Sequence, residues 1–257
     1  MDLPKNAFKA ALKAGRTQLG LWCTIPDPMV AEMLSATGYD WMMFDTEHSP
    51  MDALGTLPLL RAVAPAPVSA VVRPGALDAV EIKKMLDCGA QTLLVPYIQD
   101  AAQARAAVDA VRYPPAGIRG VAGMTRASGY GTIEGYHRRA GEEICLLLQV
   151  ETAAALAEIE AIAAVEGVDG VFVGPADLAA SLGHPGETGH PEVKAAVLDA
   201  IRRIAAAGLP PGLLTLDQGF AAEALEAGAR FVAVDLDLAL LQRGARARAA
   251  EWRERLG

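Results

Sequence analysis

Residues 39–48 read Tyr39-Asp40-Trp41-Met42-Met43-Phe44-Asp45-Thr46-Glu47-His48, an apolar run that stops abruptly in ionisable side chains. A strand that is buried along its length should not end in Asp45, Glu47 and His48 without a use for them, because burying unpaired polar groups is costly. In a parallel α/β fold, chemistry is usually placed at the C-terminal ends of the strands. The stretch therefore predicts a buried strand followed by a functional loop.

The rest of the chain repeats this alternation of strand and helix. The predicted strands are 19–25, 41–45, 68–72, 92–96, 144–150, 170–173, 212–214 and 231–234, and the predicted helices between them are 28–37, 51–64, 78–88, 101–111, 152–165, 191–207 and 218–226. Glycines follow several of the helical runs, as is usual where helices end. Eight such units in 257 residues predict an α/β protein, a closed (β/α)8 TIM barrel that forms a single domain over residues 1–257.

Two segments fall outside this repeat. Residues 113–136 are rich in Gly, Pro and Arg and are too long for an ordinary connection between a strand and a helix, so we expect a lid, a subunit contact or disorder there. The last predicted helix, residues 238–256, carries several arginines opposite an apolar stripe. It is expected to close the barrel or to pack on a neighbouring subunit.

Composition excludes several classes of function. A net charge of -8 and a pI near 5.1 argue against a surface for nucleic acid or anionic membranes. No apolar segment approaches the roughly 20 residues that cross a bilayer, and the N-terminus does not resemble a secretory signal. Cys23, Cys88 and Cys145 have neither disulfide nor metal-ligand spacing, so we expect reduced cysteines and a cytoplasmic protein.

Polar residues gather at the ends of the predicted strands. They are Asp45, Glu47 and His48 after the second strand, Arg73 after the third, Gln149 and Glu151 at the fifth, and Gly174, Pro175, Ala176 and Asp177 after the sixth. Any one of them could be a solvated turn residue or a helix cap. Together they would converge above one mouth of the barrel, which is how active sites of this fold are built.

The carboxylates Glu151 and Asp177 lie on neighbouring strands and suit Mg²⁺ or Mn²⁺, which prefer oxygen ligands. Zinc is less suited, because His184 and His190 lie in a Gly- and Pro-rich loop and no compact set of histidines is expected. Gln149 points to the same face as Glu151, since side chains alternate along a strand.

A 2-oxo acid would fit this predicted site. The turn at Gly174, Pro175 and Ala176 leads into a helix whose free N–H groups could bind a carboxylate. We expect further substrate contacts from Trp22 and Leu214, at the ends of the first and seventh strands.

Arg73 would then face the keto oxygen and stabilise the negative charge of an enolate. His48 is the natural proton-transfer group, because its ordinary pKa lies near neutral pH. Asp45 is the nearest carboxylate that could orient its ring, or it could instead hold a metal-bound water. Glu47 is expected to contact these catalytic side chains rather than the substrate itself.

Two common alternatives within this fold are disfavoured. The lysines all fall on predicted helices, which argues against a Schiff-base mechanism, and we expect no nucleotide cofactor. The seventh and eighth strands are followed by Leu214-Thr215-Leu216-Asp217 and Asp235-Leu236-Asp237 rather than by Gly-rich phosphate loops. An acidic loop would repel phosphate, so the substrate is expected to be unphosphorylated.

These motifs make the chain resemble the HpcH/HpaI aldolase family, the class II pyruvate aldolases, over nearly its whole length. The resemblance is carried by the segments 45–48, 72–74, 112–120, 149–152 and 167–178. It implies that His48 is the base, Arg73 the enolate stabiliser, Glu151 and Asp177 the ligands of Mg²⁺, Mn²⁺ or Co²⁺, and Gln149 and Ala176 contacts of pyruvate. It also implies a homo-oligomer, a hexamer built as a trimer of dimers in which the last helix is exchanged between paired subunits.

Some features stay open. The resemblance implies that Asp87 raises the basicity of the histidine. However, Asp87 would lie at the bottom of its own barrel, so it could reach His48 only in a neighbouring subunit. The alternative is that Asp87 is a solvated helix end. The segments 124–131 and 235–237 depart from the family pattern, which leaves the aldehyde uncertain. Pyruvate and hydroxypyruvate are both candidate donors. Oxaloacetate decarboxylation through the same enolate, or a non-catalytic oxo-acid binding protein, are the competing interpretations.

Overall fold

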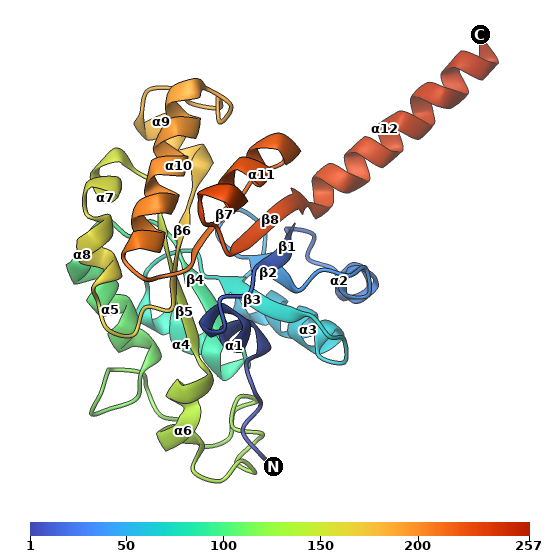
Figure 1. Ribbon diagram of the computed structural model, residues 1–257. Helices are drawn as coiled ribbons and strands as arrows, with labels where there is room; N and C mark the ends of the chain where they lie inside the picture. Colours follow the sequence, from blue (N-terminus) through green and yellow to red (C-terminus); the bar gives the residue numbers. More distant parts are fainter.

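Eight parallel strands form a closed barrel in the computed structural model, which describes all of residues 1–257 (Figure 1). The strands are β1 (Gln18–Cys23), β2 (Trp41–Asp45), β3 (Ser69–Arg73), β4 (Thr92–Val95), β5 (Cys145–Val150), β6 (Gly170–Val173), β7 (Pro211–Leu214) and β8 (Phe231–Leu236). Each strand pairs with the next in sequence, and β1 pairs with β8 to close the ring. The predicted (β/α)8 barrel is confirmed.

Helices surround this barrel. They are α1 (Ala7–Lys13), α2 (Pro28–Ser35), α3 (Ala53–Val63), α4 (Ala79–Asp87), α5 (Ala101–Val111), α6 (Tyr136–Glu143), α7 (Ala153–Ala157), α8 (Ile159–Ala163), α9 (Pro175–Ser181), α10 (Pro191–Ala206), α11 (Gln218–Ala227) and α12 (Asp237–Leu256). The single helix predicted over residues 152–165 is wrong, because the chain leaves helical geometry at Glu158 and forms α7 and α8 instead. Strand β8 is also longer than predicted and includes Asp235.

Local signals explain where the helices begin and end. Asp52, Asp78 and Asp100 precede α3, α4 and α5, and each accepts a hydrogen bond from a free N–H group of the first turn. Gly89, after α4, has φ of +96°, a left-handed conformation that few other residues adopt. Such boundaries keep the connections at the strand ends short and well defined.

The apolar core has two layers. The larger one lies between the sheet and the helices, and the smaller one fills the barrel with side chains such as Trp41, Leu147 and Phe172. Phe8 of α1 seals the N-terminal end of the barrel, because its ring packs edge-on against Trp41 at 5.8 Å. Glycine at position 20 makes room for this packing, since a Cβ there would lie 2.1 Å from the Trp41 ring. The C-terminal end of the barrel interior is therefore open for a site.

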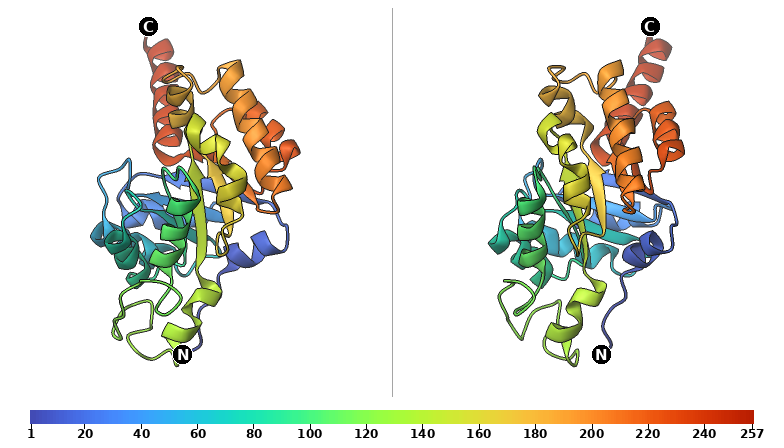
Figure 2. Two further views of the ribbon diagram at one scale, coloured as in Figure 1. Left: turned by 90° about the vertical axis from the view of Figure 1, so that its left-hand side faces the viewer. Right: turned by 60° about the vertical axis from the view of Figure 1, so that its left-hand side comes forward.

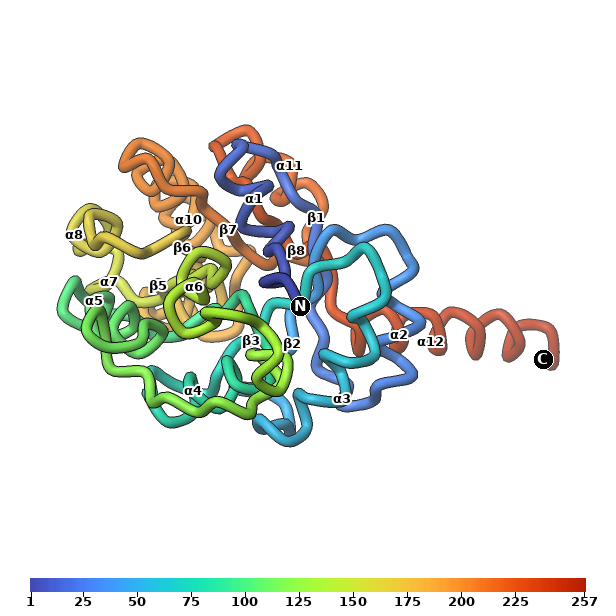
Figure 3. Tube along the Cα trace, turned by 90° about the horizontal axis from the view of Figure 1, so that it is seen from below, coloured from blue at the N-terminus to red at the C-terminus, as the bar shows by residue number.

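The segment predicted to be irregular, residues 113–136, consists of turns and leads into α6, a helix that the sequence analysis does not predict. Helix α6 is not predicted because its amphipathic pattern is short and because Gly135, at its N-terminus, has no side chain to cap it. Seen from below, α6 and the N-terminus lie over the same end of the molecule (Figure 3). The segment is therefore placed far from the C-terminal ends of the strands.

Helix α12 extends away from the barrel (Figures 1 and 2). Of its 20 residues only Asp237 is buried, whereas Leu238, Leu241 and Trp252 are about half exposed or more. The expectation that this helix closes its own barrel is therefore wrong. The alternative, that it packs on a neighbouring subunit, stays a prediction. None of the helices has the length and apolar character needed to cross a membrane.

Candidate active site

A cavity of about 390 Å³ opens at the C-terminal ends of the strands. Its lining residues are Trp22, Thr24, Asp45, His48, Ser49, Pro50, Arg73, Gln149, Glu151, Phe172, Gly174, Pro175, Ala176, Asp177, Leu214, Leu236 and Leu238. Every predicted site residue is among them except Glu47 and Asp87. Residues at the C-terminal ends of seven strands, which are far apart in sequence, therefore meet at one mouth.

Arg73 is held between two carboxylates in one wall of this cavity. Its Nε and Nη2 donate to the two oxygens of Asp45 at 2.9 and 2.6 Å, and Nη1 lies 2.9 Å from Oε2 of Glu47. The guanidinium also lies over the ring of Trp22, 4.7 Å from its centroid, and Trp22 Nε1 donates to Asp45 at 3.0 Å. Because β2 and β3 pair with Asp45 opposite Arg73, the strand register sets up this ion pair.

The two carboxylates respond differently to this environment. Burial favours the protonated form of Asp45, but the hydrogen bonds and charge of Arg73 outweigh it and hold the pKa of Asp45 below its usual value. For Glu47, burial outweighs the attraction of Arg73 and raises the pKa. Asp45 is therefore a fixed anion that orients the guanidinium.

Glu151 is almost fully buried in the opposite wall. Tyr97 N–H donates to its Oε1 at 2.9 Å, and the amide of Gln149 donates to its Oε2. Burial, reinforced by the nearby negative charges of Asp177 and Glu47, raises the pKa of Glu151 to about 7. No lysine or arginine is paired with it, so the site lacks a cation at this position.

Gly174 and Gln149 shape the space around Glu151. A Cβ at position 174 would lie 2.4 Å from Oε2 of Glu151, so only glycine fits there. The Oε1 atom of Gln149 is buried and has no hydrogen-bond partner. An unsatisfied oxygen beside an unpaired carboxylate indicates a group that this cavity is built to receive.

Asp177 and Ala176 lie on the first turn of α9, on the exposed rim of the cavity. Asp177 forms no ion pair, and its negative charge contributes to the raised pKa of Glu151. Leu214, Leu236 and Phe172 supply the apolar part of the lining. Phe172 is two residues before Gly174 and so shares its inward face, a signal in the strand period that the sequence analysis did not use.

His48 occupies the turn after β2, and its side chain is 63% exposed. Its Nε2 lies 3.9 Å from Oε2 of Glu47, while Asp45 accepts from the backbone N–H groups of Glu47 and His48. The possibility that Asp45 orients the imidazole is wrong within this chain, because both Asp45 oxygens are occupied by Arg73, Trp22 and the backbone.

Asp87 lies at the other end of the barrel. It is the last residue of α4, and it accepts a hydrogen bond at 2.8 Å from Arg119, whose guanidinium lies over the ring of Tyr113 at 4.4 Å. Asp87 therefore cannot approach His48 of the same chain. Its role across a subunit boundary stays a prediction.

Tyr97 is a site residue that the sequence analysis missed. It follows β4 with φ of 58°, a left-handed conformation that is costly for a non-glycine residue. The strain aims its N–H group at Glu151. No residue pattern indicates this contact, since it depends on the backbone alone.

Two expectations about charged residues need correction. His184 and His190 do come together, with stacked rings 3.6 Å apart, although no compact set of histidines was expected. Their planes differ by only 18°, and together with Glu192 they form a group whose ligand atoms all lie within 4.8 Å of one another, but neither histidine lines the cavity. Lys5 precedes α1 and so does not lie on a helix, and the cavity lining includes no lysine.

The acidic residues after β7 and in β8 are partnered by donors within the chain. Asp217 pairs with Lys194 at 2.7 Å, Asp235 pairs with Arg243, and Asp237 accepts from three backbone N–H groups. These contacts weaken the predicted repulsion of phosphate. The unphosphorylated substrate stays a prediction that rests on the absence of a Gly-rich loop.

The chain is similar to a known family, to named proteins and to solved structures. A family model described as HpcH/HpaI aldolase/citrate lyase matches residues 18–243. A protein of Sagittula stellata named hydroxypyruvate/pyruvate aldolase is 60% identical over 252 residues, which cover 98% of this chain and 100% of that protein. A protein of Rhizobium etli named pyruvate aldolase is 58% identical over 252 residues, which cover 98% and 99% of the two chains.

Solved structures agree with these relatives. The crystal structure of a HpcH/HpaI aldolase/citrate lyase family protein from Burkholderia cenocepacia is 39% identical, has a TM-score of 0.93, and covers 97% of this chain and 100% of its own. A citrate lyase β subunit from Mycobacterium tuberculosis, complexed with oxaloacetate and magnesium, is 20% identical with a TM-score of 0.56 and covers 88% and 93%. The second likeness concerns the fold alone. The chain belongs to the HpcH/HpaI aldolase/citrate lyase family.

Proposed function

We propose that the protein is a divalent-metal-dependent, class II aldolase. It would join pyruvate or hydroxypyruvate, as an enolate, to an unphosphorylated aldehyde to give a 4-hydroxy-2-oxo acid, and would catalyse the reverse cleavage. The observation that carries this proposal is one cavity in which two carboxylates without a cation partner, Glu151 and Asp177, face the buried guanidinium of Arg73. The names of the relatives support the choice of donor.

Glu151 and Asp177 would hold the metal ion. Their carboxylate oxygens are the ligands that Mg²⁺ and Mn²⁺ prefer, and Co²⁺ also fits. The unpartnered Oε1 of Gln149 and the space kept open by Gly174 fit a ligand-bearing ion beside Glu151. When bound, the ion supplies Lewis-acid polarisation of the 2-oxo acid.

Arg73 would stabilise the developing charge on the keto oxygen. A guanidinium has five N–H groups, and the two carboxylates engage only part of this set, so donors remain for the substrate. Asp45 and Trp22 fix the plane of the guanidinium before the substrate arrives, so little reorganisation is needed. The backbone N–H of Ala176 and the side chain of Gln149 would bind the substrate carboxylate and keto group.

His48 would move the proton. It would take a proton from the carbon next to the keto group and leave the electron pair in the enolate, which then attacks the carbonyl carbon of the aldehyde. The resulting alkoxide regains a proton. The exposed ring of His48, with Glu47 3.9 Å away, leaves this group open to solvent and to a neighbouring subunit.

Two features of the chain support a proposed assembly. The exposed apolar side chains of α12 support a homo-oligomer in which this helix packs on a second copy, and we propose the hexamer of exchanged dimers. In that assembly Asp87 of a neighbouring subunit would approach His48. Its hydrogen bond from Arg119 orients the carboxylate for this role.

Proton exchange of pyruvate in heavy water tests the proposal. The methyl protons should exchange in the presence of Mg²⁺ or Mn²⁺, stop exchanging with a chelator, and exchange at least about a hundredfold more slowly in His48→Ala and Arg73→Ala. His137→Ala is the matched control, because this histidine lies outside the cavity. Exchange within a few fold of wild type in both variants would contradict the assigned roles.

A substrate panel separates aldolase from decarboxylase. Cleavage of 4-hydroxy-2-oxo acids should exceed turnover of oxaloacetate if the aldehyde is the natural acceptor. Faster loss of CO₂ from oxaloacetate, with no aldol product from any aldehyde, would favour the decarboxylase.

A further inference from the structure

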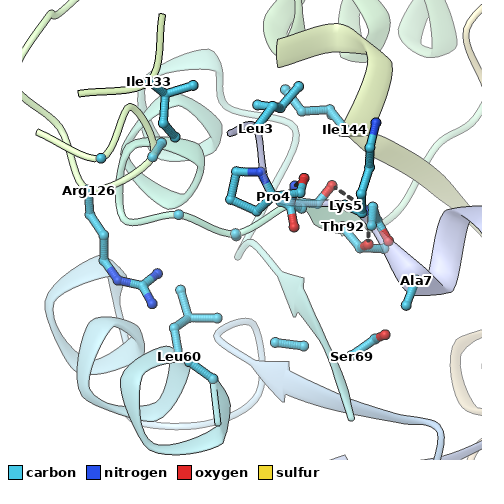
Figure 4. Close-up of a pocket in the computed structure, with 18 of the residues that line it drawn as sticks. Leu3, Pro4, Lys5, Ala7, Leu60, Ser69, Thr92, Arg126, Ile133 and Ile144 are labelled. Carbon is cyan, nitrogen blue, oxygen red and sulfur yellow. Dashed lines mark hydrogen bonds between the residues drawn. The ribbon is translucent and has the colours of Figure 1, made fainter. Parts of the chain in front are cut away.

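A second, larger cavity lies at the opposite end of the barrel from the candidate active site (Figure 4). It has a volume of about 770 Å³. Its floor includes Ser69 and Thr92, the first residues of β3 and β4, and its walls come from the segment before α1, the end of α3 and the region of α6. The cavity is therefore separate from the reaction chemistry.

Most of the wall is apolar. Leu60 lies along one side, and Leu3, Ile133 and Ile144 lie along another (Figure 4). The volume is within the range of about 300–1,000 Å³ that is usual for small-molecule sites. Such a wall favours a ligand with an apolar body, because covering it removes apolar surface from water.

Arg126 brings an unpaired cation into this apolar surrounding. Its Nη1 donates to the carbonyl oxygen of Cys88 at 2.9 Å, which fixes the side chain, but it forms no ion pair with any carboxylate. Lys5, on the opposite side of the cavity, is already paired with Glu143 at 2.7 Å. Asp2 is the one acidic residue in the lining and is exposed, and it forms no ion pair with Arg126.

The charge of the cavity also differs from that of the whole protein. The chain has a net charge of -8, yet the lining has two basic side chains and one acidic one. The guanidinium of Arg126 keeps N–H groups free on its cavity side, in the fork arrangement that matches a carboxylate. Free guanidinium N–H groups beside an apolar wall therefore define the kind of ligand that would fit this cavity.

We propose that this cavity binds an organic carboxylate with an apolar body, an aliphatic or aromatic acid larger and less polar than the 2-oxo acid of the proposed reaction. The carboxylate pairs with Arg126, and the body covers Leu60, Ile133 and the neighbouring apolar side chains. The ligand does not enter the catalytic cavity.

Calorimetric titration of the assembled wild-type protein with decanoate tests this site. Binding should be saturable, and 1-decanol and acetate should each bind at least about tenfold more weakly, because one lacks the charge and the other the apolar body. Arg126→Gln should weaken decanoate binding by about tenfold or more, with Arg126→Lys in between. Arg138→Gln is the matched control, since Arg138 is a nearby arginine outside the lining.

Three results would overturn the proposal. They are absence of decanoate binding by the wild type, equal binding by Arg126→Gln and wild type, and displacement of decanoate by oxalate with Mg²⁺, which would place it in the catalytic cavity. If a second copy of the chain fills the cavity in the assembly, the wild type will not bind decanoate, which is the first of these results. Because decanoate binding is measured without turnover, failure here leaves the aldolase proposal untouched.

Discussion

Replacing Glu151 by glutamine should stabilise the metal-free protein at pH 8. Glu151 is 1% exposed, and its pKa is raised from 4.5 to about 7 by burial and by the charges of Asp177 and Glu47. Between these two pH values the folded protein holds a proton that the unfolded chain has released, so the free energy of unfolding falls as pH rises through this interval. One pKa unit corresponds to about 1.4 kcal/mol, so the full effect is roughly 3 kcal/mol.

The glutamine variant keeps the shape and the hydrogen bonds but not the charge. Its amide oxygen can accept from Tyr97 N–H, and Gln149 can rotate its amide so that the unpartnered Oε1 accepts from the new NH₂ group. Without a titrating group at this position, the variant should exceed the wild type by up to about 3 kcal/mol at pH 8 and by less than about 1 kcal/mol at pH 5.

Urea unfolding with EDTA at pH 5 and pH 8 measures this difference, at one protein concentration because the assembly contributes to stability. Added Mg²⁺ or Mn²⁺ should then stabilise the wild type at pH 8 and leave the variant unchanged. Glu158→Gln is the control, because this exposed glutamate lies in the break between α7 and α8. A variant less stable than wild type at pH 8 in EDTA, or a gain that does not depend on pH, would refute the reasoning.

Three other changes test separate parts of the structure. Arg73→Lys keeps the charge but cannot bridge both carboxylate partners, so kcat for retro-aldol cleavage should fall about a hundredfold in steady-state assays; a change of only a few fold would show that charge alone suffices. Gly174→Ala places a Cβ 2.4 Å from Glu151 Oε2 and should weaken Mn²⁺ binding about tenfold or more by calorimetry, and an unchanged affinity would contradict this geometry. Removal of residues 241–257, the exposed part of α12, should reduce the assembly size in sedimentation while the circular dichroism of the barrel persists; an intact assembly would exclude this helix from the interface.

Much of the site is predictable from the period of the strands. Gln149 and Glu151 are two residues apart at the end of β5, so they had to share a face, and the cavity contains both. The parallel sheet likewise places Arg73 and Asp177 at the same end as Glu151. Topology alone is enough for this part, because every strand end points toward one mouth.

The partner of each charged group is not predictable in this way. Asp45 could have oriented His48 or Arg73, and the register of β2 against β3 decides in favour of Arg73. That register depends on packing along the whole barrel. Asp87 is a similar case, since only the fold shows that Arg119, 32 residues away, holds its carboxylate.

Loop conformation hides other contacts from the sequence. His184 and His190 are brought together by the turns between α9 and α10, where His190 also accepts from the N–H of Glu192 at the start of α10. Their proximity follows from backbone angles over several residues, which have no hydrophobic period to reveal them. The contact from Tyr97 to Glu151 depends in the same way on one left-handed residue.

The balance of charge explains why the cavity should bind a metal ion at all. Four carboxylates, those of Asp45, Glu47, Glu151 and Asp177, accompany the single cation of Arg73, and Asp45 alone is stabilised as an anion by it. The partly buried Glu47 and the buried Glu151 have raised pKa values, so without a metal the site relieves its excess negative charge by taking up protons. A divalent cation would relieve the same excess and release those protons, and metal binding should therefore weaken as pH falls below about 7.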